Sequence, residues 1–292
     1  MTTIKNNGGA VEIKPRRMSF PFSEMKSSLY FKDNALLSAF GAALSGTFPP
    51  GESEFIASVR LYQDKVTDPE LKQQIRGFIG QEGHHSHQHK KANEVLKGLG
   101  WDAQYVEENL GKDIAKNTSS GWRSKPKWRL AVTAGMEHMT AIMAEYMLKN
   151  PEVFDSLDER VKELLFWHAV EEIEHKSVAF DVFMSIENDQ RYLRKAMRMA
   201  NFIFNSKISM YVVVLMWKAR RFPSWREVKE FREFLFGKKG LVTQIKPAYK
   251  DYFKEGFHPW DHDNQYLIDE WKEKYYRPEH DLTTAKKETA AA

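Results

Sequence analysis

Apolar residues recur every three or four positions over long stretches of this chain, and strict alternation over four or more residues is rare. This period is typical of amphipathic α-helices and not of strands. Proline and glycine lie between the periodic stretches, which are about 15 to 30 residues long and therefore of helical length. Breaks between helices are predicted at FPPGE (48–52), TDPE (67–70), GLGWD (98–102), SGWRSKP (120–126), NPEVFDSLD (150–158), NDQ (188–190), RFPSW (221–225) and GKKG (237–240). The pattern predicts an all-α protein.

Two of the predicted helices contain a Glu-x-x-His pair on their apolar face. The first face comprises Leu71, Ile75, Phe78, Glu82, His85, His89, Ala92 and Leu96. The second comprises Val161, Leu165, His168, Glu172, His175, Ala179, Val182 and Ile186. Because every step is three or four residues, the members of each set share one side of a helix, and ionisable groups interrupt two buried faces. The residues expected beside these faces, toward solvent, are His84, His87, Glu171 and Glu174.

Two further helices each contain a single inward-facing glutamate. Glu52 shares an apolar face with Val59 and Tyr62, whereas Glu54 shares a polar face with Lys65. We therefore prefer Glu52 as the inward acid, with Glu54 as the alternative. The other helix places Glu137 in the centre of an apolar set that comprises Leu130, Ala134, Ala141, Ala144 and Leu148.

The positions of the turns bring these four acids to a common depth. Glu52 and Glu82 each lie about 15 residues from the turn at TDPE, which is about 22 Å along a helix. An antiparallel hairpin therefore sets them side by side. Glu137 and Glu172 flank the NPEVFDSLD turn in the same way. The sequence predicts two helical hairpins, each with a lone glutamate opposite a Glu-x-x-His pair.

Four buried carboxylates cannot all be ionised without compensation. Two divalent cations would balance their charge, and neutral imidazoles would complete the coordination. A buried salt-bridge network is the alternative, but few lysines or arginines share the inward faces. Since the chain has no cysteine, thiolate ligands are excluded, and carboxylate and imidazole ligands favour two Fe ions, with Mn as an alternative, over a closed zinc site. The predicted ligands are Glu52, Glu82, His85, Glu137, His168, Glu172 and His175.

Some histidines allow more than one interpretation. His168 precedes Glu172 by one helical turn, so it is either a seventh ligand or a hydrogen-bond donor behind the ligands. His89 is placed behind the ligands, with direct coordination as the alternative. His258 and His262, in GFHPWDHDN (256–264), are interpreted as parts of a packed loop and not as ligands.

Composition narrows the function classes further. The 292 residues have a net charge of only +4, so no strongly basic field indicates nucleic-acid binding. The most apolar run, ISMYVVVLMW (208–217), is about half the length needed to span a bilayer. We interpret the segment 195–221 as a core helix or channel wall in preference to an interfacial membrane helix.

The domain organisation follows from these segments. Residues 1–25 lack the apolar core of a signal peptide and are predicted to be a flexible leader. Residues 26–188 are predicted to form a ferritin-like four-helix bundle that binds the metals. Residues 189–275 are expected to add helices to the same domain, and 276–292 to form a tail. A cytoplasmic protein is predicted, with a homodimer as the prior expectation for its assembly.

Several motifs resemble those of a known family. FPPGE, IGQEGHHSHQH, FWHAVEEIEHKSVAFDVF and GFHPWD resemble motifs of bacterial proteins labelled predicted metal-dependent hydrolases, over roughly residues 15–275. The order of acids and histidines also resembles that of ferritin-like di-iron oxygenases. The His-Glu-His spacing of 168, 172 and 175 is similar to the p-aminobenzoate N-oxygenase type. One departure is the Pro-Pro-Gly helix start predicted beside Glu52.

The primary functional hypothesis is a non-haem di-iron oxygenase. It would use O2 as co-substrate and an electron donor to oxidise a small, hydrophobic organic molecule by N-oxygenation or hydroxylation. Glu82 and Glu172 are candidates to bridge the metals, with Glu52 and Glu137 terminal. The alternative is a dinuclear metal-dependent hydrolase that uses a metal-bridging water. A third hypothesis is a non-catalytic iron-binding protein.

Overall fold

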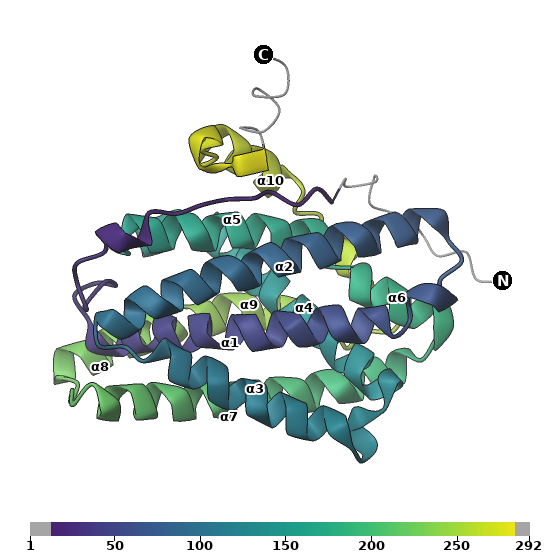
Figure 1. Ribbon diagram of the computed structural model, residues 1–292, viewed down its shortest axis with the longest axis horizontal. Coiled ribbons are helices and arrows are strands. Elements are labelled where there is room, and N and C mark those ends of the chain that lie inside the picture. The colour runs from purple at the N-terminus through teal and green to yellow at the C-terminus, as the bar shows by residue number, and fades with distance from the viewer. Residues whose placement is uncertain (1–12, 284–292) are drawn as a thin grey trace.

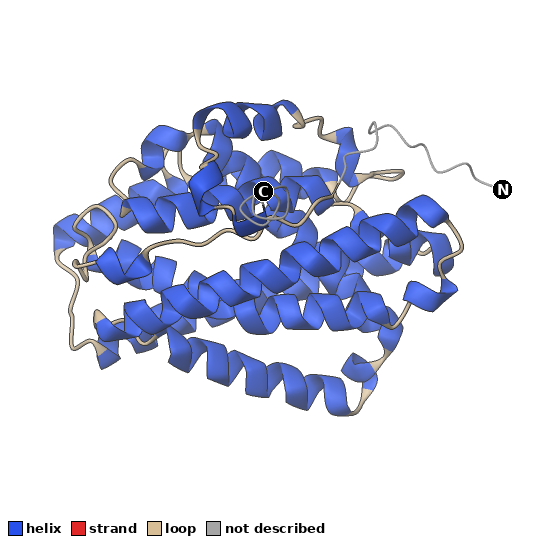
Figure 2. Cartoon of the chain, turned by 45° about the horizontal axis from the view of Figure 1, so that its top comes forward, coloured by secondary structure: helices blue, strands red, loops and turns tan. Residues whose placement is uncertain are grey.

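The computed structural model describes residues 13–283, which form helices and no strands (Figures 1 and 2). The α-helices are α1 (Ala35–Arg60), α2 (Pro69–Gly98), α3 (Ala103–Ser119), α4 (Pro126–Lys149), α5 (Glu159–His175), α6 (Val178–Ile186), α7 (Gln190–Lys218), α8 (Trp225–Phe236), α9 (Leu241–Asp251) and α10 (Tyr266–Lys274). The described residues also form six 3-10 helices, of which the first precedes α1, the last follows α10 and the others lie between α-helices: η1 (Phe22–Glu24), η2 (Gln63–Lys65), η3 (Trp122–Ser124), η4 (Pro151–Phe154), η5 (Pro259–Asp261) and η6 (Pro278–His280). The prediction of an all-α protein is confirmed.

Both predicted hairpins are present. Asp68 caps α2, because its side chain accepts hydrogen bonds from the amides of Glu70 and Leu71, and Pro69 begins the helix. Asp158 caps α5 in the same way, after the 3-10 turn η4. Helix α1 packs against α2 and α4 packs against α5, so the two turns set the depth of the residues on each helix pair.

Helix α1 differs from the sequence prediction, because FPPGE (48–52) is not a break. The helix runs through Pro49 and Pro50, and Glu52 therefore lies well inside it. Pro49 has no amide hydrogen to give to the carbonyl of Ser45 one turn earlier. Asn93 of α2 donates to that carbonyl instead, at 3.2 Å. A side chain of the neighbouring helix thus replaces a hydrogen bond that the local sequence cannot form.

The second Glu-x-x-His helix also differs, because it is interrupted at Lys176 and Ser177. The predicted continuous face of 161–186 is therefore divided between α5 and α6. The buried Lys176 ammonium group donates at 2.7 Å to the carbonyl of His262 and, also at 2.7 Å, to Asn264 Oδ1. The interruption thus joins the end of α5 to the loop that precedes α10.

Residues 13–25, which the sequence analysis assigns to a flexible leader, lie along α2 and α5 as a packed segment (dark purple in Figure 1). Met18, Phe20, Phe22 and Met25 of this segment are buried. Phe20 packs on Trp167 of α5 with ring centroids 5.7 Å apart. Residues 278–282, from the predicted tail, pair with it through hydrogen bonds such as Ser19 N–H to the His280 carbonyl. Residues 1–12 and 284–292 lie outside the described range.

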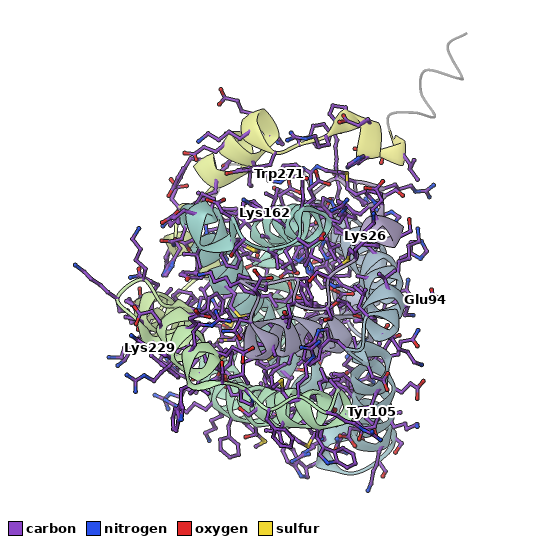
Figure 3. The ribbon with its side chains drawn as sticks, turned by 90° about the vertical axis from the view of Figure 1, so that its left-hand side faces the viewer. Lys26, Glu94, Tyr105, Lys162, Lys229 and Trp271 are labelled. Atoms are coloured by element: carbon purple, nitrogen blue, oxygen red, sulfur yellow. The ribbon has the colours of Figure 1, made fainter. Side chains whose placement is uncertain are left out.

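Further helices cover the two hairpins on opposite sides. Helices α3 and α7 pack on α1, and α7 also packs on α4, at the lower side of Figure 1. Helix α10 packs on α5 at the upper side, where Trp271 faces the region of Lys162 in Figure 3. With α2, α4, α10 and residues 13–25 packed around it, α5 is buried on every side from Phe166 to its C-terminal end, including positions that a two-sided helix would expose to water.

Candidate metal centre

The seven predicted ligand residues converge between α1, α2, α4 and α5. All are buried, at most 4% exposed, and they are Glu52, Glu82, His85, Glu137, His168, Glu172 and His175. Their oxygen and nitrogen atoms form three groups in which every pair of atoms lies within 4.8 Å. These groups are Glu52, His85 and His168; Glu82, His85 and Glu172; and Glu82, Glu137 and His175. Since two of the groups share His85 and two share Glu82, they form one continuous cluster.

Glu52 and Glu54, the two candidates for the inward acid of α1, lie in different surroundings. Glu52 Oε1 lies 3.8 Å from His168 Nε2, inside the cluster. Glu54 instead forms a bidentate ion pair with Arg129 of α4, at 2.7 and 2.9 Å, away from the cluster. Because α1 is continuous through Pro50, the two residues project about 200° apart around one helix axis.

The cluster contains more acceptor atoms than hydrogen-bond donors. Across the described range 13–283, both carboxylate oxygens of Glu52, Glu82 and Glu137 are buried without a hydrogen-bond partner. His175 Nε2 lies 3.1 Å from Glu82 Oε1 and 3.3 Å from Glu137 Oε2, again without hydrogen-bond geometry. Buried polar atoms are normally satisfied, so lone pairs that converge in this way are the arrangement expected around a cation.

No arginine or lysine in residues 13–283 forms an ion pair with the four inward carboxylates, which have only histidines as basic neighbours. This disfavours the salt-bridge network considered as the alternative. Burial, followed by the charges of the neighbouring carboxylates, raises the pKa of Glu52 and of Glu137 well above its ordinary value. Without cations, the cluster would therefore have to bind protons to reduce its charge.

The surroundings of His85 favour its neutral imidazole. Burial, together with the nearby His168, lowers the pKa of His85 to about 3. Its Nε2 lies 3.0 Å from Glu171 Oε2, so this nitrogen carries the hydrogen and donates it. The other nitrogen, Nδ1, has its lone pair directed toward Glu82 and Glu172, at 3.8 and 3.9 Å. A carboxylate behind a ligating imidazole fixes its orientation and increases its basicity.

Glu171 and Glu174 are not in contact with solvent, and that prediction is wrong. Glu171 is 0% exposed and Glu174 is 3% exposed, because the 13–25 segment covers this side of α5. Arg16 of that segment binds both: its Nη1 lies 2.9 Å from Glu171 Oε1 and 3.0 Å from Glu174 Oε2. A single guanidinium group thus contacts two carboxylates behind the cluster and compensates one of their two negative charges.

Gln81 connects this network to the second histidine. Its amide nitrogen donates to Glu174 Oε2 at 2.7 Å, and its amide oxygen accepts from His175 Nδ1 at 2.9 Å. His175 consequently directs Nε2 into the cluster. Burial lowers the pKa of His175, but Glu172 and the other carboxylates outweigh burial and raise it well above its usual value. In the absence of a metal the surrounding carboxylates therefore favour the protonated form of this imidazole.

A different chain of contacts supports His168. Its Nε2 lies 2.9 Å from Glu172 Oε1, and its Nδ1 lies 2.9 Å from Nε2 of His89. His89 Nδ1 in turn lies 2.9 Å from the hydroxyl of Ser45, which donates to Asn93 at 2.6 Å. His89 is thus located behind His168, at the position that the sequence analysis preferred for it. Between His168 and Asn93 this chain contains no carboxylate or arginine, and Asn93 in turn donates to Glu107 Oε2 at 3.3 Å.

An apolar cavity of about 130 Å³ adjoins the cluster on the His168 side. His168 and Glu172 line it, as do His89 and Thr140, and Thr140 donates a hydrogen bond to Glu172 Oε2. The remaining wall is mostly aromatic and aliphatic, formed by side chains of α1, α4, α5, η4 and α8, such as Phe154 of η4 and Phe234 of α8. The cavity therefore has a polar end at the cluster and an apolar end away from it.

The loop histidines have acidic partners of their own. His258 Nε2 lies 2.9 Å from Asp181 Oδ1, and His262 Nε2 lies 3.2 Å from Asp251 Oδ2. Both belong to the packed loop around η5, as predicted. The sequence analysis missed several residues that contact the cluster or its support, among them Arg16, Gln81 and Thr140. The excess of glutamate in EEIEH (171–175) was the available signal that a buried cation was needed nearby.

Comparison with protein families gives an independent result. The sequence model of a family described as predicted metal-dependent hydrolases matches residues 14–263, a range that includes Arg16 and all seven cluster residues. Nothing matches among curated proteins or among solved structures. The family description names dependence on a metal, and the buried His and Glu groups of this chain form a site able to hold one. This chain belongs to the family of predicted metal-dependent hydrolases.

Proposed function

We propose that the protein is a dinuclear metal-dependent hydrolase whose substrate places an apolar group in the adjoining cavity. Six buried carboxylate oxygens, on Glu52, Glu82 and Glu137, have no hydrogen-bond partner among residues 13–283, and this observation supports the metal site most directly. Four carboxylates balance the charge of two divalent cations, provided that the imidazoles are neutral. The described family favours hydrolysis over the oxygenase that is the primary hypothesis from sequence.

The proposed roles depend on whether a residue lies on the side of the cluster that Arg16 closes or at the end that adjoins the cavity. His85 and His175 would hold the cations from the side that Arg16 closes, with Glu82 between them. When bound, the cations supply Lewis acidity, which polarises the scissile bond and makes water a better nucleophile near neutral pH. Glu172 and His168 lie at the cavity end, where they can orient the reacting group and transfer its proton. The apolar wall excludes water from the remainder of the substrate.

A di-iron oxygenase is the second candidate, and the donor set itself favours it. A lone glutamate from each of α1 and α4 and a Glu-x-x-His pair from each of α2 and α5 is the arrangement of the ferritin-like di-iron carboxylate bundles. On this proposal α1, α2, α4 and α5 form a ferritin-like four-helix bundle. The metals would be Fe, and O2 and an electron donor would be required. The apolar cavity accommodates a hydrophobic substrate equally well in both cases.

One set of measurements separates the two candidates. The purified protein is depleted with a chelator and reloaded separately with Fe(II), Mn(II) and Zn(II), and metal content is determined. Hydrolysis of aryl esters and phosphate esters with alkyl chains of increasing length is then measured beside O2 consumption. Metal-dependent cleavage without O2 consumption supports the hydrolase. O2 consumption by the Fe(II) form, without cleavage of any ester, overturns it in favour of the oxygenase.

A further inference from the structure

Helix α7 has one buried face and one exposed apolar face. The buried face packs on α1 and α4 through residues such as Leu193, Tyr211 and Leu215. On the opposite face Phe202 is 73% exposed, Val213 is 67% exposed and Trp217 is 76% exposed. Soluble helices normally place polar residues on such a face. By length and composition alone α7 could cross a bilayer, but a helix that supports the core on one side cannot be surrounded by lipid.

The exposed apolar face continues beyond the end of α7. Phe222, in the connection to α8, is 92% exposed, and Trp225, the first residue of α8, is 90% exposed. Single exposed apolar residues are common on protein surfaces, but a set that follows one helix face and extends into the next loop indicates an interaction site. Tryptophan and phenylalanine are the side chains that favour the boundary between water and lipid.

The charges along the same segment are of one sign. Residues 190–221 contain eight basic residues and no acidic residue. Three exposed cations, Arg191, Lys195 and Arg198, precede the apolar face, and Lys218 and Arg220 follow it. Two of these basic residues form ion pairs with acids of α3 and its N-cap. Asp113 of α3 pairs with Lys207, and the N-cap residue Asp102 pairs with Lys218. An apolar face with cations at both ends is complementary to a surface that has an apolar interior beneath a layer of anionic groups.

We propose that the exposed face of α7, with Phe222 and Trp225, binds peripherally to a bilayer that contains anionic lipid, with α7 parallel to the membrane plane. The aromatic side chains enter the interfacial region, and the cations contact lipid phosphates. A second copy of the chain would bring two sets of cations together, which disfavours a symmetric dimer through this face. The apolar cavity gives a further reason, resting on the proposed function, because apolar substrates concentrate in membranes.

Vesicle sedimentation tests this proposal. The full-length, metal-loaded protein is mixed with vesicles of phosphatidylcholine alone and of phosphatidylcholine with phosphatidylglycerol. The double variant Trp217→Ser/Trp225→Ser removes two exposed rings, and Tyr266→Ser on α10, at the opposite side of Figure 1, is the matched control. We expect binding to the anionic vesicles that falls about tenfold or more in the double variant, is unchanged in the control and weakens with added salt. Melting temperature and metal content verify that each variant is folded.

Three results would overturn the proposal. The first is the absence of binding to either vesicle, and the second is equal binding with and without phosphatidylglycerol. The third is a dimer, detected by analytical ultracentrifugation, that the double variant converts to a monomer, since a second copy would then cover the face. None of these results depends on catalysis, so a failure here is distinguishable from a failure of the proposed hydrolase.

Discussion

The two sides of the cluster are supported in different ways. Behind His85 and His175 lie two buried carboxylates, and Arg16 closes this side with a guanidinium group that contacts both. Behind His168 lies a neutral chain that runs through His89 to Ser45. The first side is covered by the packed 13–25 segment, whereas the second adjoins the cavity.

This difference indicates a division of labour between the two sides. A carboxylate that accepts a hydrogen bond from an imidazole makes its other nitrogen a stronger ligand and fixes the ring. A chain of neutral donors and acceptors can reverse its hydrogen-bond direction, because hydroxyl and imidazole groups both donate and accept. We therefore expect the Arg16 side to hold the metals and the His168 side to adapt when substrate binds.

The largest expected effect comes from a residue that both sides share. Glu172 contacts His168 at 2.9 Å and lies 3.6 Å from His175, so Glu172→Ala should lower metal content from about two ions per chain to one or none. Metal analysis after dialysis measures this. Glu54→Ala is the control, since Glu54 pairs with Arg129 outside the cluster and should leave the metal content unchanged. Equal loss in both variants would show that the ligand set is wrong.

Replacing Arg16 should have the next largest effect. Arg16→Ala leaves Glu171 and Glu174 buried without their cation, which typically costs about 3–5 kcal/mol. Metal affinity should fall as well, because both imidazoles lose their fixed orientation. This also revises the sequence interpretation of Glu174, whose replacement by alanine should now weaken metal binding. Urea unfolding and competition with a chelator measure the two effects.

The adjacent Arg17 provides a matched control, since its side chain is exposed and it lies in the same segment. Arg17→Ala should change the free energy of unfolding by less than about 0.5 kcal/mol. Arg16→Lys keeps the charge but loses the two-pronged contact, so its effect should be intermediate. If Arg16→Ala and Arg17→Ala lowered the free energy of unfolding equally, the contacts of Arg16 with Glu171 and Glu174 would contribute nothing to stability, and the comparison of the two sides would fail.

The convergence of the seven residues was predictable because the helical period converts sequence spacing into a shared face. Glu82 and His85 share the inward face of α2 whatever surrounds that helix, and the capped turn at Asp68 sets their depth. The continuity of α1 was not predictable, because a side chain of α2, Asn93, satisfies the carbonyl that Pro49 leaves unpaired. Such a contact has no local sequence pattern.

The burial of Glu171 was also unpredictable, because it depends on a contact with a residue that is distant in the sequence. Its partner Arg16 lies 155 positions away, in a segment without helical period. Periodicity divides a helix into an inner and an outer face, and it cannot show that another segment covers the outer face. The signal was instead chemical: several glutamates without nearby cations on their own helix require a cation from elsewhere.

The third prediction tests whether cations, and not protons, balance the charge. Burial and neighbouring carboxylates raise the pKa of Glu137 above its usual 4.5, so above that pH the folded, metal-free protein retains a proton that the unfolded chain has released. Stability therefore falls as pH rises, by about 1.4 kcal/mol per pH unit for this proton. The glutamine in the Glu137→Gln variant cannot ionise. When a chelator keeps the protein metal-free, the free energy of unfolding of this variant, relative to that of the unchanged protein, should therefore increase with pH.

With metal present the sign should reverse, because the cations replace the protons and the glutamine variant loses a ligand. Urea unfolding over a series of pH values, with chelator and with metal, measures both slopes. Glu54→Gln is the control and should show no such divergence. A stability difference for Glu137→Gln that is independent of pH and of metal would mean that this carboxyl is neither desolvated nor a ligand.

The smallest effect is expected on the cavity side. Ser45→Ala removes the hydroxyl that contacts His89 at 2.9 Å, so His89 no longer fixes the ring of His168 through Nδ1. Replacing a group behind a ligand usually lowers metal affinity by about tenfold to a hundredfold, and we expect the lower value because this chain is uncharged. The Michaelis constant should change more than the metal affinity, because Ser45 and His168 both line the cavity. The two sides would be equivalent if Ser45→Ala released metal as readily as Arg16→Ala, and the division between a holding side and an adapting side would then have to be abandoned.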